Sequence, residues 1–362
     1  MTVLFNKKTN KYEVRCYYKD IMGNTKQKTK RGFTSERAAR KWEKEFKMQT
    51  DLDLTMPFEK FVEVYFNDIK PRLKLSTWNN KKEIFNKKIL PYFKGKSLMD
   101  IKTTDIIRWQ NHLMNLQNKN GKKYAPTYLR TINNQLNAMF NHAERYYDLQ
   151  KNPAKKAGNM GKSKANAMQI WTTEEYRRFL ECVANKPISF YAFEILYWTG
   201  IREGEMLALT MEDFDFETNT LRINKNLYRH GGEIYITDPK TDKSIRNIKI
   251  PQFLADEMKE YFKSLYHLKP TDRIFSISKN YLYYEMKRGC KASGVKRIRI
   301  HDLRHSHCSL LIQKGYTVVA IADRLGHESI EITYMYAHLF PSVQSEMAND
   351  LNNEKELMYH VS

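Results

Sequence analysis

The stretch FYAFEILYWTGIREGEM, residues Phe190–Met206, joins an apolar run to a glycine and then to an arginine. The apolar run predicts a buried helix, and Gly200 is typical of the residue that ends one. The sequence therefore places Arg202 just beyond the end of a core helix. Taken alone, the same pattern is also what an ordinary exposed arginine would show.

Three further stretches place cationic side chains at helix faces or turns. HDLRH puts His301 and Arg304 three positions apart, which is one face of a helix. LGHES places His327 after a glycine, and PKTDKSIRNI places Lys240 at a hairpin turn. Taken singly, each stretch has an ordinary interpretation, such as a helix-capping histidine or a solvated lysine. Their significance depends on their occurring together.

Histidines His301 and His305 have the four-residue spacing of zinc proteases, with Asp302 where the general base of those enzymes stands. The match is poor, because aspartate is one carbon shorter than glutamate and Arg304 would put a cation beside the metal. No third ligand follows in an obvious position. We therefore expect neither a metal nor a cofactor.

The stretch MEDFDFET alternates the acids Asp213, Asp215 and Glu217 with phenylalanines. Such alternation is typical of a half-buried strand or an extended turn with its acids in solvent. A two-metal nuclease could use such a cluster, but no other acidic group pairs with it by any signal in the sequence. We interpret these acids as structural.

The charge indicates a polyanionic partner. The 362-residue chain has 62 Lys and Arg against 41 Asp and Glu, a formal net charge of +21. Nucleic acid is the commonest polyanion that such a distributed positive field meets, although a merely soluble basic protein is the alternative. The length exceeds that of most single cores, so two or three domains are expected.

Cysteine usage and hydropathy indicate the compartment. Four cysteines lie far apart without a C-x-x-C pair, which argues for a reducing environment: Cys16, Cys182, Cys290 and Cys308. The N-terminus has no signal-peptide core, and no apolar run approaches the roughly 18 residues that span a bilayer. We expect a cytoplasmic protein with no membrane partner.

Residues 1–50 predict a small sheet followed by a helix. Strands alternate over residues 3–33, with turns near Lys8–Asn10 and at Gly23–Asn24, and a helix begins at Thr34–Glu36. A module this small has little core. Its basic strand face is therefore expected to bind DNA, as some sheets do by entering a groove.

The remaining chain predicts two larger parts. Helical periodicity in FEKFVEVYFNDIKP and in three later stretches indicates a helical bundle over residues 55–155, closed by Asn152-Pro153 and followed by the linker MGKSKANAM. From Ile170 onward helices return. Hairpin strands interrupt them around His230–Gly232, with a second turn near Lys240 to Ser244.

Five motifs in order complete the pattern: T-G-x-R-x-x-E, P-K-T-x-x-S-x-R, H-x-L-R-H, L-G-H and Y-x-H-L. In these the chain resembles the tyrosine recombinase (phage integrase) family. The resemblance also covers the helical bundle and the small sheet, which is similar to the arm-type DNA-binding domain of integrases. It implies a mainly α fold with small β-sheets: an arm module at 1–50, a SAM-like core-binding bundle at 55–155, a mixed α/β catalytic domain at 169–340 and a tail at 341–362.

The resemblance also selects one of two tyrosines. The family nucleophile stands nine positions after the histidine of L-G-H and is followed by any residue and then histidine. Tyr336 meets both conditions, and Tyr334 meets neither. By the same resemblance, Arg202, Arg304, His301 and His327 would surround the cut phosphate.

Three further assignments follow from the resemblance. His301 is the expected proton acceptor, and Lys240 on its hairpin turn is the expected general acid, preferred over Lys243 because it stands in P-K-T. Glu205 matches an acidic position of the family and is expected to hold a clamp arginine or histidine in place; the alternative is a solvated helix carboxylate.

The implied activity is site-specific DNA recombination through a covalent 3′-phosphotyrosine. Expected partners are double-stranded DNA with core-type and arm-type sites and three further copies in a tetramer on DNA. The resemblance also admits an excision factor or a DNA-bending protein. Apolar residues at near-helical spacing in the tail, among them Met347 and Leu351, suggest packing on a neighbouring copy. The alternatives are a type IB topoisomerase-like enzyme and a non-catalytic DNA-binding regulator of the same fold.

Overall fold

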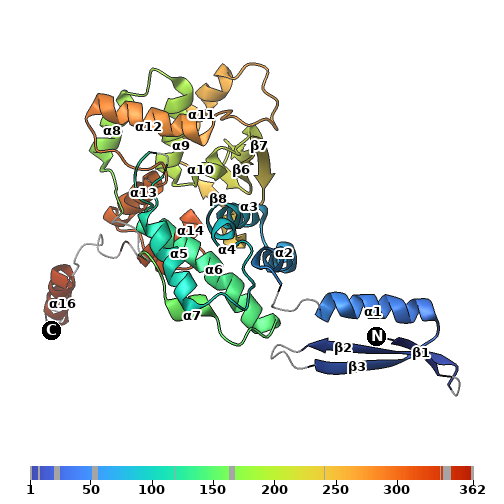
Figure 1. Cartoon of the computed structure of the whole chain (residues 1–362). Coiled ribbons are helices and arrows are strands. Elements are labelled where there is room, and N and C mark those ends of the chain that lie inside the picture. The colour runs from blue at the N-terminus through green and yellow to red at the C-terminus, as the bar shows by residue number, and fades with distance from the viewer. Residues whose placement is uncertain are drawn as a thin grey trace. The chain divides into compact units, whose positions relative to one another are not determined.

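A computed structural model describes residues 2–6, 9–19, 25–50, 56–118, 120–162, 168–239, 241–334, 336 and 344–359 (Figure 1). The chain divides into two compact units, Met1–Asn166 and Ala167–Ser362. Helices predominate and the sheets are small, which confirms the predicted fold class. None of the helices in the described ranges combines the length and apolar content that crossing a bilayer requires.

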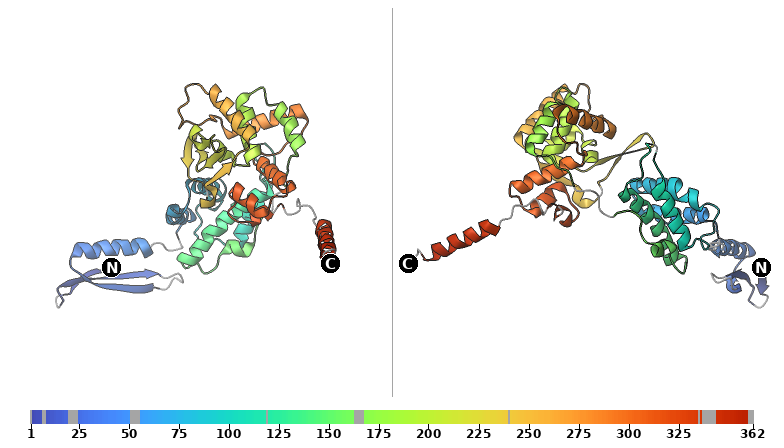
Figure 2. Two further views of the ribbon diagram at one scale, coloured as in Figure 1. Left: turned by 180° about the vertical axis from the view of Figure 1, so that it is seen from behind. Right: turned by 60° about the vertical axis from the view of Figure 1, so that its left-hand side comes forward.

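The N-terminal module is an antiparallel sheet with one helix, as predicted. Its order is β1-β2-β3, and its elements are β1 Thr2–Asn6, β2 Lys11–Lys19, β3 Thr25–Phe33 and α1 Glu36–Thr50. Helix α1 runs along one face of the sheet (Figures 1 and 2). Val14 and Cys16 are buried against Ala39 of α1. The predicted turn at Gly23–Asn24 lies outside the described residues.

A bulge at Gly32 alters the pairing of β2 with β3. Tyr12 lies opposite Phe33 and Glu13 lies opposite Arg31, so Gly32 is the extra residue, with φ 97°. Residues two apart on a regular strand share a face. Because of the bulge, Phe33 instead packs toward α1, while Arg31 joins Glu13 on the other face.

The rest of the first unit is the predicted helical bundle. Its bounds are α2 Phe58–Ile69, α3 Leu75–Ile84, a π-turn Phe85–Ile89, α4 Leu90–Phe93, α5 Thr103–Asn115, α6 Pro126–Tyr146 and α7 Pro153–Ala157, with a 3-10 turn at Lys70–Arg72. Asn152 caps α7 by accepting from the amides of Ala154 and Lys155 at 2.8 and 3.0 Å. The core extends to Met160, which is 3% exposed and lies beyond the predicted end at residue 155.

The second unit surrounds a buried helix. Its helices are α8 Thr173–Glu181, α9 Pro187–Thr199, α10 Glu203–Met206, α11 Gln252–Ser264, α12 Lys279–Ser293, α13 Asp302–Gln313, α14 Val318–Leu325 and α15 Glu331–Tyr334. Helix α9 contacts both α13 and α11. Because α9 is apolar on most of its surface, it is buried on most sides. The run that predicted a core helix therefore does form one.

Strands are inserted in this unit where the sequence predicts them. One sheet has the order β4-β5-β8, and a separate hairpin pairs β6 with β7: β4 Phe214–Asp215, β5 Thr220–Ile223, β6 Asn226–His230, β7 Glu233–Thr237 and β8 Arg246–Lys249. Two 3-10 turns are Met211–Asp213 and Asp242–Ser244. The second turn leads directly into β8.

One part of the interpretation of the MEDFDFET acids is wrong. Asp213 does not lie in solvent but is 2% exposed. It accepts from the backbone amide of Thr210 at 2.8 Å and forms an ion pair with Lys225 at 2.8 Å. Asp215 accepts from the amide of Thr218 at 3.1 Å. Both acids thus satisfy local backbone donors, as residues at turns often do.

The tail contains helix α16, Gln344–Tyr359. Its apolar residues Met347, Leu351 and Met358 are 52%, 71% and 72% exposed. The described part of this chain therefore leaves these three side chains largely uncovered.

Candidate active site

Two helix ends and one buried arginine make the centre of the candidate site. Helices α9 and α14 both end at a left-handed glycine, Gly200 and Gly326, each with φ 65°. Arg304 of α13 donates from Nη1 to the carbonyl of Gly200 at 2.8 Å and from Nη2 to that of Leu325 at 2.7 Å. Carbonyls at a helix carboxyl end lack partners and carry partial negative charge, so a guanidinium suits them.

Neither glycine has room for a side chain. A Cβ at Gly200 would lie 2.6 Å from Cδ2 of His307, and one at Gly326 would lie 2.8 Å from the carbonyl oxygen of Lys243. The positive φ adds backbone strain for any other residue. The two glycines thus allow the end of α9 to pack closely against His307 and the end of α14 to pack closely against Lys243.

Arg304 is only 4% exposed. Burial and the nearby Arg202 cation lower the pKa of Arg304 to about 9, so this guanidinium stays charged at neutral pH. Two backbone carbonyls therefore hold this buried cation in its orientation.

Arg202 is held differently, by an acidic side chain. Its Nη1 donates to Glu205 at 2.6 Å and its Nη2 to the carbonyl of Gly326 at 3.0 Å. Glu205 is 2% exposed and also accepts from Nη2 of Arg246, at 3.0 Å. Burial alone would raise the pKa of Glu205, but the charges of Arg246 and Arg202 hold it below its usual value. The solvated-carboxylate alternative for Glu205 is therefore wrong.

His327 lies next to the same two arginines. Its Nδ1 is 2.7 Å from the hydroxyl of Thr333. Burial and the charges of Arg304, Arg202 and Arg246 lower the pKa of His327 to about 3, so the ring is neutral at pH 7. In the tautomer in which Nδ1 accepts from the Thr333 hydroxyl, Nε2 carries the proton and can donate a hydrogen bond to a phosphate oxygen.

Tyr336 is buried beside this group. Its side chain is 1% exposed and packs with Cys308, Ile312 and Leu325. Burial raises the pKa of the Tyr336 phenol, while the charge of Arg304 acts to lower it. Of the two tyrosines considered in the sequence, the structure describes the side chain of Tyr336 and not that of Tyr334.

The histidine that touches Tyr336 is not the one expected from the sequence. Nδ1 of His305 forms a hydrogen bond with the Tyr336 hydroxyl. His301, the expected proton acceptor, instead packs edge-on against the His305 ring, with centroids 4.9 Å apart. Nε2 of His305 lies 3.8 Å from the Asp302 carboxylate. The signal for His305 was present as the last letter of H-x-L-R-H, but spacing alone does not say which histidine reaches the phenol.

The turn near Lys240 to Ser244, where the general acid is expected, contains residues that contact Arg202 and the segment after His327. Lys240 itself lies outside the described residues. The Thr241 and Ser244 hydroxyls are 3.0 Å apart, and Nη1 of Arg202 is 3.4 Å from the Ser244 hydroxyl. Nζ of Lys243 donates to the carbonyl of Glu328 at 3.3 Å, one residue after His327. The end of the turn therefore contacts the arginine clamp.

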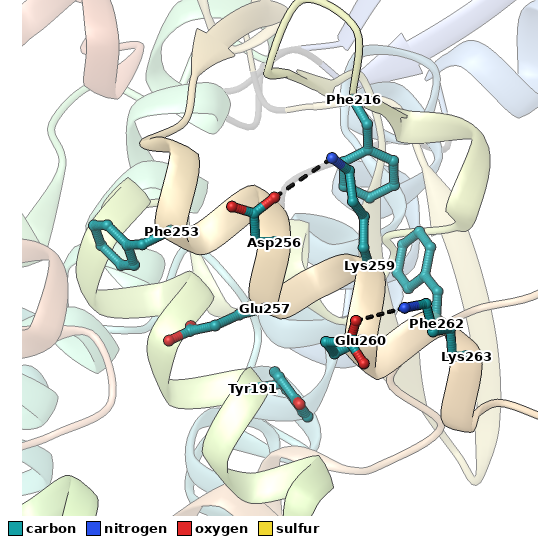
Figure 3. Close-up of a pocket in the computed structure, with 9 residues that line it drawn as sticks. All are labelled: Tyr191, Phe216, Phe253, Asp256, Glu257, Lys259, Glu260, Phe262 and Lys263. Carbon is teal, nitrogen blue, oxygen red and sulfur yellow. Dashed lines mark hydrogen bonds and ion pairs between the residues drawn. The ribbon is translucent and has the colours of Figure 1, made fainter.

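A hollow of about 1000 Å³ elsewhere in the unit holds none of these residues. It lies along α11 and is lined by aromatic and charged side chains, including Tyr191, Phe253 and Glu257 (Figure 3). Its Asp256–Lys259 and Glu260–Lys263 pairs, at 3.4 and 2.5 Å, satisfy each other within the helix. In the described ranges no group of three His, Cys, Asp or Glu residues could hold a metal.

Sequence comparisons now identify the family. The phage integrase family model matches residues 169–342, its N-terminal SAM-like domain matches residues 57–114, and an arm DNA-binding domain matches residues 3–50. The chain is 30% identical over 316 residues to the ICEBs1 integrase of Bacillus subtilis (strain 168), covering 83% of each. The chain belongs to the phage integrase family of tyrosine recombinases. It is a site-specific recombinase, an integrase of mobile elements, with an arm-type DNA-binding domain.

Other relatives and solved structures agree with this fold. A XerC-like tyrosine recombinase of Caldanaerobacter subterraneus subsp. tengcongensis is 27% identical over 291 residues, covering 72% of this chain and 73% of the relative. The Tn1549 transposon integrase in complex with a circular intermediate DNA superposes with TM-score 0.65 at 19% identity, over 80% of this chain and 98% of that one. A lambda integrase tetramer bound to a Holliday junction gives 0.57 at 17% identity, over 90% and 95%.

Proposed function

We propose that this recombinase cuts DNA by attack of Tyr336 on a backbone phosphate held by Arg202, Arg304 and His327. One observation carries the proposal: Arg304 binds the carbonyls of Gly200 and Leu325 at the ends of α9 and α14, and Arg202 binds that of Gly326, next to His327. Attack would break the phosphorus bond to the 5′-oxygen and leave a 3′-phosphotyrosine. The same arginines suit this step, because a guanidinium presents a planar fork of donors to phosphate oxygens.

In this proposal one residue accepts a proton and another donates one, while a third forms a hydrogen bond near the phosphate. His305 accepts the phenol proton, because it is the histidine in hydrogen-bond contact with Tyr336. Lys240 gives a proton to the leaving 5′-oxygen, and His301 adds a hydrogen bond near the phosphate. Only about one phenol in a thousand is ionised at pH 7 without help, so such a base is needed. A phenol that is 1% exposed must also turn outward to meet DNA.

The covalent intermediate retains the energy of the cut bond. A 5′-hydroxyl from a second strand can therefore attack the phosphotyrosine and rejoin the DNA without ATP. Because the reaction is reversible, strands can be exchanged between two DNA sites. An enzyme that only relaxes DNA, or a regulator that does not cut it, would not need to pair two sites. The expected direction is integration of the element, with excision by the same chemistry.

We further propose a division of labour along the chain. Residues 1–50 bind arm-type sites, residues 55–155 bind the core site, residues 169–340 cut and rejoin, and the tail at 341–362 packs on a neighbouring copy in a tetramer. Exposed Met347, Leu351 and Met358 of α16 support the last point. An excision factor or DNA-bending protein would join this assembly. With bacterial relatives and DNA as substrate, we place the protein in the bacterial cytoplasm.

The covalent step has a direct test. The full chain is incubated with a duplex from the DNA flanking its own gene, carrying a 5′-phosphorothiolate that traps the intermediate, and adducts are separated on a denaturing gel. Wild type and Tyr334→Phe should form the adduct, and Tyr336→Phe should form none. An adduct that persists in Tyr336→Phe would remove the assignment. Relaxation of a supercoiled plasmid without the site would favour the topoisomerase alternative.

A further inference from the structure

The sheet of the N-terminal module has one covered and one open face. Val14 and Cys16 point to the face that α1 covers. Because side chains alternate along a strand, Glu13, Arg15 and Tyr17 point to the other face. Arg15 lies opposite Thr29 and Glu13 lies opposite Arg31. Among the described residues, the open face of this DNA-binding module therefore carries Arg15, Arg31, Tyr17 and the buried carboxylate of Glu13.

That carboxylate joins the two arginines. Oε1 of Glu13 accepts from Nε and Nη2 of Arg15, at 3.1 and 2.7 Å. Oε2 accepts from Nε of Arg31 at 3.1 Å. The Glu13 side chain is 10% exposed, whereas those of Arg15 and Arg31 are 45% and 75% exposed. Each carboxylate oxygen thus fixes one guanidinium that remains open to solvent.

The bulge at Gly32 makes this arrangement possible. Without the extra residue, Arg31 would share a face with Phe33, which packs against Trp42 with ring centroids 5.8 Å apart. With it, Arg31 lies directly opposite Glu13. The hydrogen bond from Arg15, despite opposing burial, holds the pKa of Glu13 below its usual value, so the carboxylate is charged at neutral pH.

We propose that Glu13 is a positioning residue that orients Arg15 and Arg31 to read base edges in arm-type sites. This inference rests on the proposed binding of arm sites by residues 1–50. A guanidinium recognises guanine by donating two hydrogen bonds to O6 and N7 in the major groove, which requires a fixed plane. The contact from Nε and Nη2 of Arg15 to Glu13 sets that plane before DNA arrives.

The negative charge of Glu13 distinguishes a positioning role from a role in general electrostatic attraction to DNA. A carboxylate among phosphate-binding residues weakens attraction to any DNA, because phosphate contacts depend on positive charge. Two unheld arginines would bind phosphates of every sequence equally well. Glu13 therefore lowers general affinity and raises discrimination between sequences. Its removal should have opposite effects on these two quantities.

The test uses the full chain and a pool of duplexes with a randomised window. Sequences retained by wild type are read out, and affinities are then measured for the enriched arm duplex and for a scrambled duplex. In Glu13→Gln, the ratio of these affinities should fall by roughly tenfold. Affinity for the scrambled duplex should stay level or rise. Arg15→Lys should lower the same ratio while keeping the charge.

Matched variants separate positioning from net charge and from folding. Glu36→Gln removes the same charge from the same module, where Glu36 pairs with Arg40 on α1 at 2.7 Å, and should leave the ratio unchanged. An unchanged ratio in Glu13→Gln overturns the proposal. So does equal weakening of both duplexes with a lower thermal midpoint, because that is what a purely structural carboxylate would give. The measurement involves no cleavage, so it stands or falls separately from the assignment of Tyr336.

Discussion

The arginines of the catalytic unit and those of the N-terminal sheet are held in opposite ways. Arg304 is 4% exposed and is gripped by two backbone carbonyls at helix ends. The Arg31 side chain is 75% exposed and is held by one carboxylate. A phosphate is the same in every DNA sequence, so a rigid backbone grip suits it. Base edges differ between DNA sequences. A few substitutions can alter the orientation of an exposed arginine that is held by another side chain. Arg202 is intermediate, with one carbonyl and one carboxylate partner.

The largest effect is expected for Arg304→Lys. Lysine keeps the charge but cannot reach both carbonyls and still present a fork to phosphate. Loss of one such donor costs about 2.7 to 4 kcal/mol in the transition state, or roughly 10² to 10³ in rate. Single-turnover cleavage of a trapping substrate measures it. Arg177→Lys on the exposed side of α8 is the control and should cut normally. A loss under about tenfold for Arg304→Lys would show that the backbone grip is unimportant.

Gly200→Ala changes the helix end whose carbonyl accepts from Arg304. The added Cβ meets the His307 ring at 2.6 Å and sits at φ 65°, so strain and displacement together should cost about 3 kcal/mol of unfolding free energy. Gly315→Ala is the matched control, with φ 81° but nothing within 4 Å of its Cβ, and should cost about 1 kcal/mol. Denaturant unfolding gives both values. Equal losses would mean that close approach of the helix end to His307 does not matter.

Glu205→Gln weakens the side-chain part of the Arg202 grip. It leaves Arg246, 7% exposed, without its anionic partner, so we expect about 2 kcal/mol of destabilisation at pH 7. The pKa of folded Glu205 lies below the ordinary 4.5. Its stabilising effect is therefore present above pH 4.5 and is lost as pH falls through the lower folded value. Unfolding measured from pH 7 down to pH 3 should show the two proteins converging, and a constant gap would contradict the ion-pair assignment.

The smallest effect is expected in the sheet, for Gly32→Ala. Nothing lies within 4 Å of the added Cβ, so only the strain of φ 97° remains, about 1 kcal/mol. This loss of stability is measured by thermal unfolding of the N-terminal module within the full chain, with hydrogen exchange of the β3 amides as the readout. The variant should also lose some discrimination between arm duplexes, because Arg31 depends on the bulge to face Glu13. Full discrimination together with lower stability would separate the bulge from the positioning of Arg31.

Much of this protein follows from local sequence alone. Apolar periodicity and glycine positions were enough for the buried helix α9 and its end at Gly200, because these depend on neighbours in the chain. The order of the arginine, histidine and tyrosine motifs was enough for the family. The strands of residues 2–33 likewise follow from alternation and turn residues.

Only the tertiary structure decided which groups meet. It placed His305 rather than His301 at the Tyr336 phenol, buried Asp213 beside Lys225, and turned Arg31 toward Glu13 through one extra residue. Each outcome depends on packing between segments far apart in the chain or on a one-residue change in register. Periodicity reports which face a side chain takes in an ideal element, and it carries no information about the partner that occupies the opposite side.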